Sequence, residues 1–177
     1  MRTKNRVVRA GAPVLAAAGL ALGLVVGTAG SASAGITDGR WHLKNVHSGK
    51  CLVIQGSTVG DTPGQYDCAS FQDQVWLIMG PALPVGYNGI DGVYKLYNTN
   101  SKLYLSASGP DNGNPIVQVP GSQDLTQWWS VKQRGGDFQF KNAATGRCMV
   151  IQGYDNWSRA FQYDCSDVWD DQWWQQT

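Results

Sequence analysis

The stretch CLVIQGSTVGDTPGQYDC, residues 51–68, recurs later in the chain as CMVIQGYDNWSRAFQYDC, residues 148–165. Both copies begin with a cysteine, a hydrophobic residue and Val-Ile-Gln-Gly, and both end with Gln-Tyr-Asp-Cys. The two cysteines are equally far apart in the two copies. Self-similarity of this kind predicts a protein built from repeated structural units.

The repeat extends beyond the cysteine loops and occurs three times. Each unit ends in the tripeptide Gln-x-Trp, at residues 74–76, 127–129 and 172–174. The units cover about residues 40–79, 93–132 and 137–177. The middle unit is degenerate: we expect Leu103 at the position of the first cysteine and Gly121 at the position of the second.

The local pattern inside each unit is that of short β-strands. Hydrophobic and polar residues alternate in RWHLKNV, VYKLYN and DFQFKN, and each segment is followed by a turn and a short apolar run. Gly, Pro, Asp and Asn interrupt the chain every few residues, and no segment keeps a helical period. The sequence therefore predicts an all-β fold of about four strands per unit, with three units packed around a shared axis so that the sheet closes.

Residues 1–34 have the pattern of a secretory signal peptide. Basic residues precede an apolar run, and the small residues Ala-Ser-Ala end at Ala34. No later apolar run is long enough to span a bilayer. We therefore expect a secreted, extracellular protein with a single mature domain, residues 35–177. Four cysteines in an exported domain of this size predict two disulfides.

Composition argues against several classes of function. Loss of the first 34 residues removes four of the 14 Lys and Arg residues, which leaves ten against 13 Asp and a net charge of −3. Nucleic-acid binding is not expected, because it requires a basic surface. The chain contains no Glu and its Asp residues lie mostly in turns, whereas glycoside hydrolysis needs two separated carboxyl groups. We predict no enzyme activity, no catalytic residues, no cofactor and, with two His and no closely spaced cysteine pairs, no metal site.

The three Gln-x-Trp tripeptides, the SGKCL and TGRCM segments and the cysteine loops resemble the ricin B-type β-trefoil lectins. The resemblance covers nearly all of the chain after residue 40. It implies a β-trefoil with pseudo-threefold symmetry and carbohydrate-binding function. It also implies disulfides from Cys51 to Cys68 and from Cys148 to Cys165, and a supporting role in the core for the Gln-x-Trp residues.

The resemblance further implies a shallow sugar pocket in each unit, built from an Asp after the first cysteine, an aromatic ring before the second, and an Asn before Gln-x-Trp. Units one and three keep the ring and have Asp at the Asn position, whereas Val53 and Val150 replace the Asp. Gln55 and Gln152, or the displaced Asp residues, are candidate substitute acceptors for sugar hydroxyls. The predicted carbohydrate-binding residues are Gln55, Gln65, Tyr66, Asp73 and Gln74 in unit one, and Gln152, Gln162, Tyr163, Asp171 and Gln172 in unit three.

The middle unit is not expected to bind sugar. Val119 stands at the position of the ring, Thr126 precedes Gln127, and Leu105 or Ser106 occupies the Asp position. Two weak sites on one rigid body favour polymers or arrayed glycans over free sugars.

Two further expectations concern partners. A separate enzyme or toxin chain is a candidate partner, because lectins of this family are often attached to such proteins. The alternative function is a protein-interaction module, such as a protease inhibitor or an accessory subunit, that has lost sugar binding. Its contact surface would be the loop of residues 79–92, between units one and two.

Overall fold

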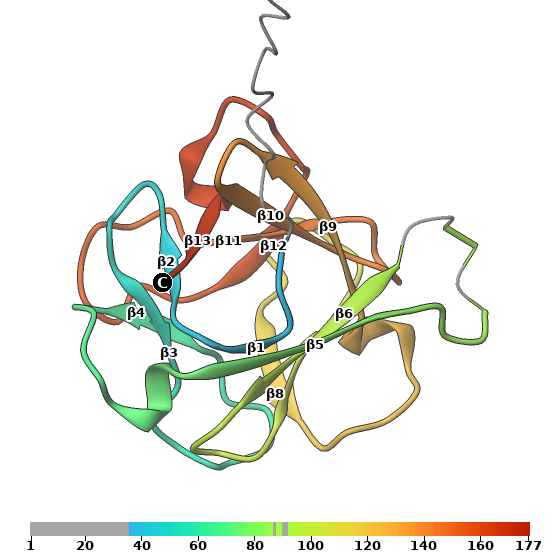
Figure 1. The fold of residues 1–177 in the computed structure, drawn as a ribbon, viewed down its shortest axis with the longest axis horizontal. Helices are drawn as coiled ribbons and strands as arrows, with labels where there is room; N and C mark the ends of the chain where they lie inside the picture. Colours follow the sequence, from blue (N-terminus) through green and yellow to red (C-terminus); the bar gives the residue numbers. More distant parts are fainter. Residues whose placement is uncertain (1–35, 87, 90–91) are drawn as a thin grey trace, which may run out of the picture. The chain divides into compact units, whose positions relative to one another are not determined.

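The computed structural model describes residues 36–86, 88–89 and 92–177. The predicted signal peptide, residues 1–34, lies outside the described residues. Figure 1 shows three groups of short strands, coloured blue to green, yellow-green to gold, and orange to red, arranged around a common centre. The all-β prediction is confirmed. None of the helices in the described ranges is long and apolar enough to cross a bilayer.

Each repeat supplies four strands, apart from an interruption in the first strand of repeat one. Repeat one contains β1 (Gly39–Trp41), β2 (Leu43–Asn45), β3 (Cys51–Val53), β4 (Gly64–Tyr66) and β5 (Trp76–Ala82). Repeat two contains β6 (Val93–Asn98), β7 (Tyr104–Ala107), β8 (Ile116–Val119) and β9 (Trp129–Arg134). Repeat three contains β10 (Asp137–Asn142), β11 (Cys148–Val150), β12 (Phe161–Tyr163) and β13 (Trp174–Gln176). A 3-10 turn precedes each final strand: η1 (Gln72–Gln74), η2 (Leu125–Gln127) and η3 (Asp170–Gln172).

The sheet is not closed by strand pairing, contrary to expectation. Its main path runs β1-β5-β6-β9-β10-β13-β2-β3-β4. In this path β1 pairs with β5 and β2 pairs with β13, but β1 and β2 do not pair with each other. They are successive parts of one chain segment, so His42 between them connects the two sides covalently. The His42 backbone N–H donates to the Thr177 carbonyl at 3.1 Å, and the Thr177 N–H donates to the His42 carbonyl at 3.1 Å.

The core is built from layers to which each repeat contributes one residue. The three tryptophans of the Gln-x-Trp tripeptides are fully buried: Trp76, Trp129 and Trp174. Two more layers pack with them, formed by Leu52, Leu105 and Met149 and by Leu43, Leu96 and Phe140. Removal of these large side chains from water is the main force that holds the repeats together.

Buried glutamines connect each repeat to a loop of another. Gln65, Gln118 and Gln162 occupy the same position in β4, β8 and β12, and all three are fully buried. Their carboxamide N–H groups donate to the backbone carbonyls of Gly153, Gly56 and Gly109, at 2.7, 3.0 and 2.9 Å. These bonds satisfy loop carbonyls that burial would otherwise leave unpaired, so they fix the loops beside the candidate sites.

Both predicted disulfides are present, Cys51–Cys68 and Cys148–Cys165, each with its Cα atoms 5.0 Å apart. In repeat two, the residue at the first cysteine position is Tyr104, which corrects the expectation of Leu103. Lys44 pairs with Cys51 and Lys141 with Cys148, and in the same register Tyr97 pairs with Tyr104. The Tyr104 ring fills the space of the disulfide, because a Cβ on Gly121 would lie 2.7 Å from it.

Candidate functional site

Two equivalent hollows lie beside η1 and η3, and equivalent hydrogen bonds fix the backbone of an aspartate in each. The Asp73 carbonyl accepts from the Ile54 N–H at 3.1 Å and from the Asn98 side chain at 2.9 Å. The Asp171 carbonyl accepts from Ile151 at 3.2 Å and from Asn45 at 2.9 Å. The backbone of each aspartate is therefore fixed by its own repeat and by the first hairpin of another repeat.

The hollow of repeat three is the more aromatic of the two. It has a volume of about 440 Å³ and is lined by His47, Gln152, Tyr163, Val168, Trp169, Asp170 and Asp171. The rings of Tyr163 and Trp169 meet edge to face, with their centroids 6.3 Å apart. Trp169 remains 48% exposed, so its indole is available to a ligand. His47 comes from repeat one, and its ring stacks on exposed Tyr154 at 4.1 Å.

The hollow of repeat one has a volume of about 340 Å³ and is lined by Gln55, Phe71, Gln72, Asp73 and Asn100. Phe71 stands where repeat three has Trp169 and is 63% exposed. Asn100 comes from repeat two and occupies the position of His47. Its side chain donates to the Gln55 carbonyl at 3.3 Å. The two hollows thus share a plan: an exposed ring, a glutamine, an aspartate and one residue from another repeat.

The two aspartates are the electrostatic feature of these hollows. In each, one carboxylate oxygen, Oδ1, is buried without a hydrogen-bond partner among the described residues. Burial raises the pKa of Asp73, against the opposing effect of backbone hydrogen bonds. Burial also raises the pKa of Asp171, where the charge of His47 lowers it and that of Asp170 raises it. Each hollow therefore holds an acceptor whose hydrogen-bonding capacity is incompletely used.

The predicted ring of repeat one does not face its hollow. Among the described residues, Tyr66 contacts the indole of Trp157 from repeat three, with ring centroids 4.9 Å apart, and it does not line the hollow of Asp73. Of the ten predicted sugar-binding residues, the structure brings Gln55 and Asp73 together in one hollow and Gln152, Tyr163 and Asp171 together in the other.

The four remaining predicted glutamines lie in the interior. Gln65 and Gln162 hold loop carbonyls, and their own carbonyl oxygens accept from the hydroxyls of Ser48 and Thr145, each at 2.6 Å. Gln74 and Gln172 are buried and bridge the backbone of the preceding loop, through bonds to Asp67 and Ala69 and to Asp164 and Ser166. Their hydrogen-bonding groups are engaged within the protein, so these glutamines stabilise the loops around the hollows and do not line them.

The middle repeat lacks a comparable arrangement. Ser106, at the Val53 position, donates its hydroxyl to Thr126 Oγ1 at 3.0 Å, and Thr126 Oγ1 in turn donates to Asp124 at 2.9 Å. These polar groups satisfy one another. Among the described residues, Val119 stands at the position of the ring and Thr126 at that of Asp73, so this place in the fold has neither the ring nor the aspartate of the other two repeats.

Sequence reasoning did not identify His47 and Asn100 as site residues. Both lie at the tip of the first hairpin of one repeat and line the hollow of another. The sequence does show that the two residues hold the same position in their repeats, because each lies two residues after an equivalent asparagine, Asn45 or Asn98. The contact across a repeat boundary could not be seen within a single unit.

Comparison with known proteins agrees with the fold. The family model described as ricin-type beta-trefoil lectin domain-like matches residues 29–119 and 74–163. No curated protein sequence matches the chain.

Several solved structures are similar, all below 25% identity. A designed threefold-symmetric protein, ThreeFoil, is 23% identical with a TM-score of 0.70, over 79% of this chain and 99% of its own. The Rhizoctonia solani agglutinin is 18% identical with a TM-score of 0.67, over 81% of this chain and 96% of its own.

One similar structure is an enzyme, an exo-beta-1,3-galactanase from Clostridium thermocellum. It is 17% identical with a TM-score of 0.68, over 78% of this chain but 30% of the galactanase chain. These likenesses establish the β-trefoil fold. Together with the family match over most of its length, they show that the chain belongs to the ricin-type beta-trefoil lectin domain-like family.

Proposed function

We propose that this protein is a secreted, non-catalytic carbohydrate-binding protein whose sites are the hollows of repeats one and three. The observation that carries the proposal is the same pair of groups in both hollows. Each joins an exposed ring, Phe71 or Trp169, to a half-buried aspartate that lines the hollow. A pyranose offers complementary groups, because its C–H face packs on an aromatic ring and its hydroxyls donate to carboxylates.

The acceptor in this proposal differs from the one usual in the family. Val53 and Val150 are buried apolar residues and offer no hydrogen bond. Asp73 and Asp171 take over the role on the opposite rim, with Gln55 and Gln152 as neutral partners. In the hollow of repeat three, Tyr163, Trp169 and His47 add further ring surface, so we expect it to bind sugar more tightly than the hollow of repeat one.

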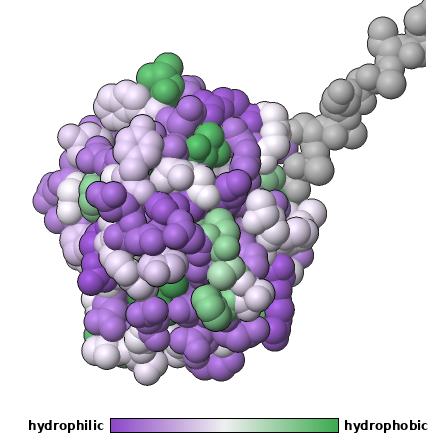
Figure 2. Space-filling model, turned by 90° about the vertical axis from the view of Figure 1, so that its left-hand side faces the viewer, coloured by the Kyte–Doolittle hydropathy of each residue, from purple (hydrophilic) through white to green (hydrophobic). Residues whose placement is uncertain are grey.

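The surface also supports a hydrophilic ligand. On the face in Figure 2, hydrophilic residues predominate and hydrophobic residues form small, separate patches. Small apolar patches of this kind are ordinary on soluble proteins and differ from the broad apolar area of a stable protein interface. Two shallow sites on one body would act together on a polysaccharide or on arrayed glycans. A separate enzyme chain could thereby be directed to its polymer.

The test is binding of the oxidised protein to immobilised glycans and insoluble polysaccharides. We expect Asp171→Ala to weaken binding by roughly tenfold to a hundredfold, because a hydroxyl loses its charged acceptor. Tyr163→Ala and Asp73→Ala should weaken it less. Asp111→Ala, an exposed change in the middle repeat, should leave binding unchanged.

Two outcomes would contradict the proposal. Binding that survives the double variant Asp73→Ala/Asp171→Ala would show that the ligand sits elsewhere. Failure of the folded protein to bind any glycan would favour the protein-interaction alternative. In that case, the described part of the loop of residues 79–92 offers Leu83 and Val85 as contact residues, 66% and 99% exposed.

A further inference from the structure

One residue breaks the threefold pattern of the loops. Gly60, Gly113 and Trp157 are equivalent, because their N–H groups donate to the carbonyls of the equivalent glutamines Gln118, Gln162 and Gln65 at 2.8, 2.8 and 2.7 Å. All three have positive φ, namely 93°, 83° and 71°. This backbone region suits glycine and is a genuine outlier for a bulky residue. Repeat three therefore keeps a tryptophan at a position where its backbone is strained.

Repeat one is shaped to receive this tryptophan. Gly64 stands where repeat three has Phe161 and repeat two has Val117. A Cβ on Gly64 would lie 3.1 Å from the Ser158 carbonyl oxygen and 3.4 Å from the Trp157 Cα. The absent side chain thus lets the loop of repeat three approach β4 closely. The Trp157 ring rests on Tyr66 and is still 43% exposed.

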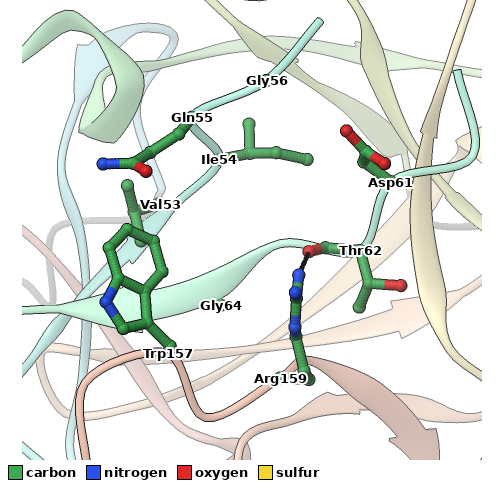
Figure 3. A pocket seen from close by; sticks show the side chains of 9 residues that line it. All are labelled: Val53, Ile54, Gln55, Gly56, Asp61, Thr62, Gly64, Trp157 and Arg159. Carbon is green, nitrogen blue, oxygen red and sulfur yellow. Dashed lines mark hydrogen bonds between the residues drawn. The ribbon is translucent and has the colours of Figure 1, made fainter. Parts of the chain in front are cut away.

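Trp157 forms one wall of a hollow between repeats one and three, with a volume of about 240 Å³. Figure 3 shows its indole on one side, beneath Val53 and Gln55. The Asp61 carboxylate stands on the opposite side, and Arg159 rises between the two. Gln55 lines both this hollow and that of Asp73, so the two hollows adjoin.

The groups around this hollow can bind a polyhydroxylated ring. Asp61 and Arg159 form no salt bridge with any described residue, although both line the hollow. Arg159 is held in place by one bond, from Nη1 to the Thr62 carbonyl at 2.6 Å. Its other N–H groups can still donate, and the Asp61 carboxylate can accept. The volume lies below that of a drug-sized site and suits one small ring.

We propose that this hollow is a composite subsite for a single neutral pyranose, with repeat three supplying the platform and repeat one the acceptor. The ring packs on Trp157, a hydroxyl donates to Asp61, and Arg159 donates to a second hydroxyl. An acidic sugar would meet Asp61 and an amino sugar would meet Arg159, so a neutral ring is the best match. The ligand class rests on the proposed function, whereas Trp157, Asp61 and Arg159 line neither the hollow of Asp73 nor that of Asp171.

The competing interpretation is that Trp157 only packs the loop onto Tyr66. This interpretation and the subsite make different predictions for the Asp61 carboxylate, which takes no part in that packing. Arg159 does take part, through its bond to the Thr62 carbonyl of repeat one and its bridge to Gly64. Asp61→Asn should therefore weaken ligand binding if the subsite exists and leave it unchanged if Trp157 has a packing role alone.

The experiment follows the indole N–H resonances of the ¹⁵N-labelled protein by NMR. The protein is titrated with glucose, galactose, mannose and their N-acetylamino derivatives. Trp157→Phe and Trp157→Gly identify the Trp157 signal, and the Trp169 signal reports on the hollow of repeat three.

We expect saturable shifts of the Trp157 signal with at least one neutral sugar. The affinity read from these shifts should be roughly tenfold weaker in Asp61→Asn or Arg159→Gln and unchanged in Asp111→Asn. In the variants that lack this indole, binding is followed by the backbone amide signal of Asp61: Trp157→Phe should retain binding and Trp157→Gly should lose it.

The outcomes separate this inference from the proposed function. If Trp169 shifts and Trp157 does not, the composite subsite is refuted and the proposed function stands. If Trp157 shifts equally in wild type, Asp61→Asn and Arg159→Gln, the subsite is likewise refuted. If neither indole responds in the folded protein and no glycan is retained on the panel, both proposals fail.

Discussion

Repeats one and three have cysteine loops with nearly the same ends and equivalent disulfides, yet they present different surfaces. Tyr163 faces Trp169 in its own hollow, whereas Tyr66 lies against Trp157 from another repeat. The cause is a pair of substitutions far apart in the chain. Repeat one has Gly64 where repeat three has Phe161, and the loop that packs on each carries Trp157 or Gly113. A repeated site is thus shaped by its neighbour across the repeat boundary as much as by its own residues.

The two repeats are alike in their framework, so removal of either disulfide should have a similarly large effect. We expect Cys51→Ala/Cys68→Ala and Cys148→Ala/Cys165→Ala each to lower the free energy of unfolding by about 3 kcal/mol, because each loop is of similar length. The measurement is chemical denaturation of both double variants under matched conditions. A much larger loss in one of them would show that the two frameworks are not equivalent.

Exchange of the residue that distinguishes the two repeats should have the next largest effect. Gly64→Phe places the side chain of repeat three into repeat one, where a Cβ already lies 3.1 Å from a backbone oxygen. We expect a loss of about 1–3 kcal/mol from overpacking, together with displacement of Trp157, visible in its indole NMR signal. Gly136→Phe is the control, because a Cβ there meets nothing within 4 Å. Equal losses in the two variants would contradict the explanation.

The fold followed from the sequence because its signals lie within each repeat. The Gln-x-Trp tripeptides mark the core layer that contains Trp76, Trp129 and Trp174, and the cysteine loops mark β3–β4 and β11–β12. The sequence predicted Leu103 at the first cysteine position of the middle repeat, whereas the structure has Tyr104 there. No cysteine marks this position, and Leu103 is more hydrophobic than Tyr104. The larger Tyr104 ring fills the space of a disulfide beside Gly121.

The candidate sites were less predictable, because their walls come from different repeats. Asp73 and Asp171 could be found by alignment of each unit with the family pattern. His47 and Asn100 reach their hollows from another repeat, and Trp157 covers a tyrosine about ninety residues away in sequence. The buried roles of Gln65 and Gln162 depend on loops of other repeats in the same way. These contacts follow from packing between repeats, and the pattern within a single unit does not show which other repeat each residue reaches.

The two site aspartates should each be slightly destabilising, which offers a smaller test of how alike the hollows are. Because burial raises both pKa values, the folded protein favours the protonated carboxyl. The resulting stability is complete at a pH below the ordinary value of 3.8 and is lost as the pH rises through the raised pKa. At neutral pH, Asp73→Asn and Asp171→Asn should therefore each raise the free energy of unfolding, by up to about 1 kcal/mol.

Thermal unfolding at neutral and acidic pH measures this effect, with Asp111→Asn as the exposed control. The gain from Asp73→Asn and Asp171→Asn should disappear when the pH is low enough to protonate the native carboxyls. A loss of stability at neutral pH would mean that the charged carboxylates are better satisfied than their unpartnered oxygens indicate.

The smallest expected effect concerns the one residue of each hollow that comes from another repeat. His47→Asn places in the hollow of repeat three the residue type that Asn100 supplies to the hollow of repeat one. The charge of His47 lowers the pKa of Asp171. Its removal should therefore raise the pKa of Asp171 further, as followed by carboxyl ¹³C NMR during a pH titration. Asp73 is the internal control, since its pKa shift has no contribution from His47. An unchanged pKa at Asp171 would mean that His47 contributes ring surface to the hollow of repeat three but no charge, and Asp170 would then be the charge that distinguishes this hollow from that of repeat one.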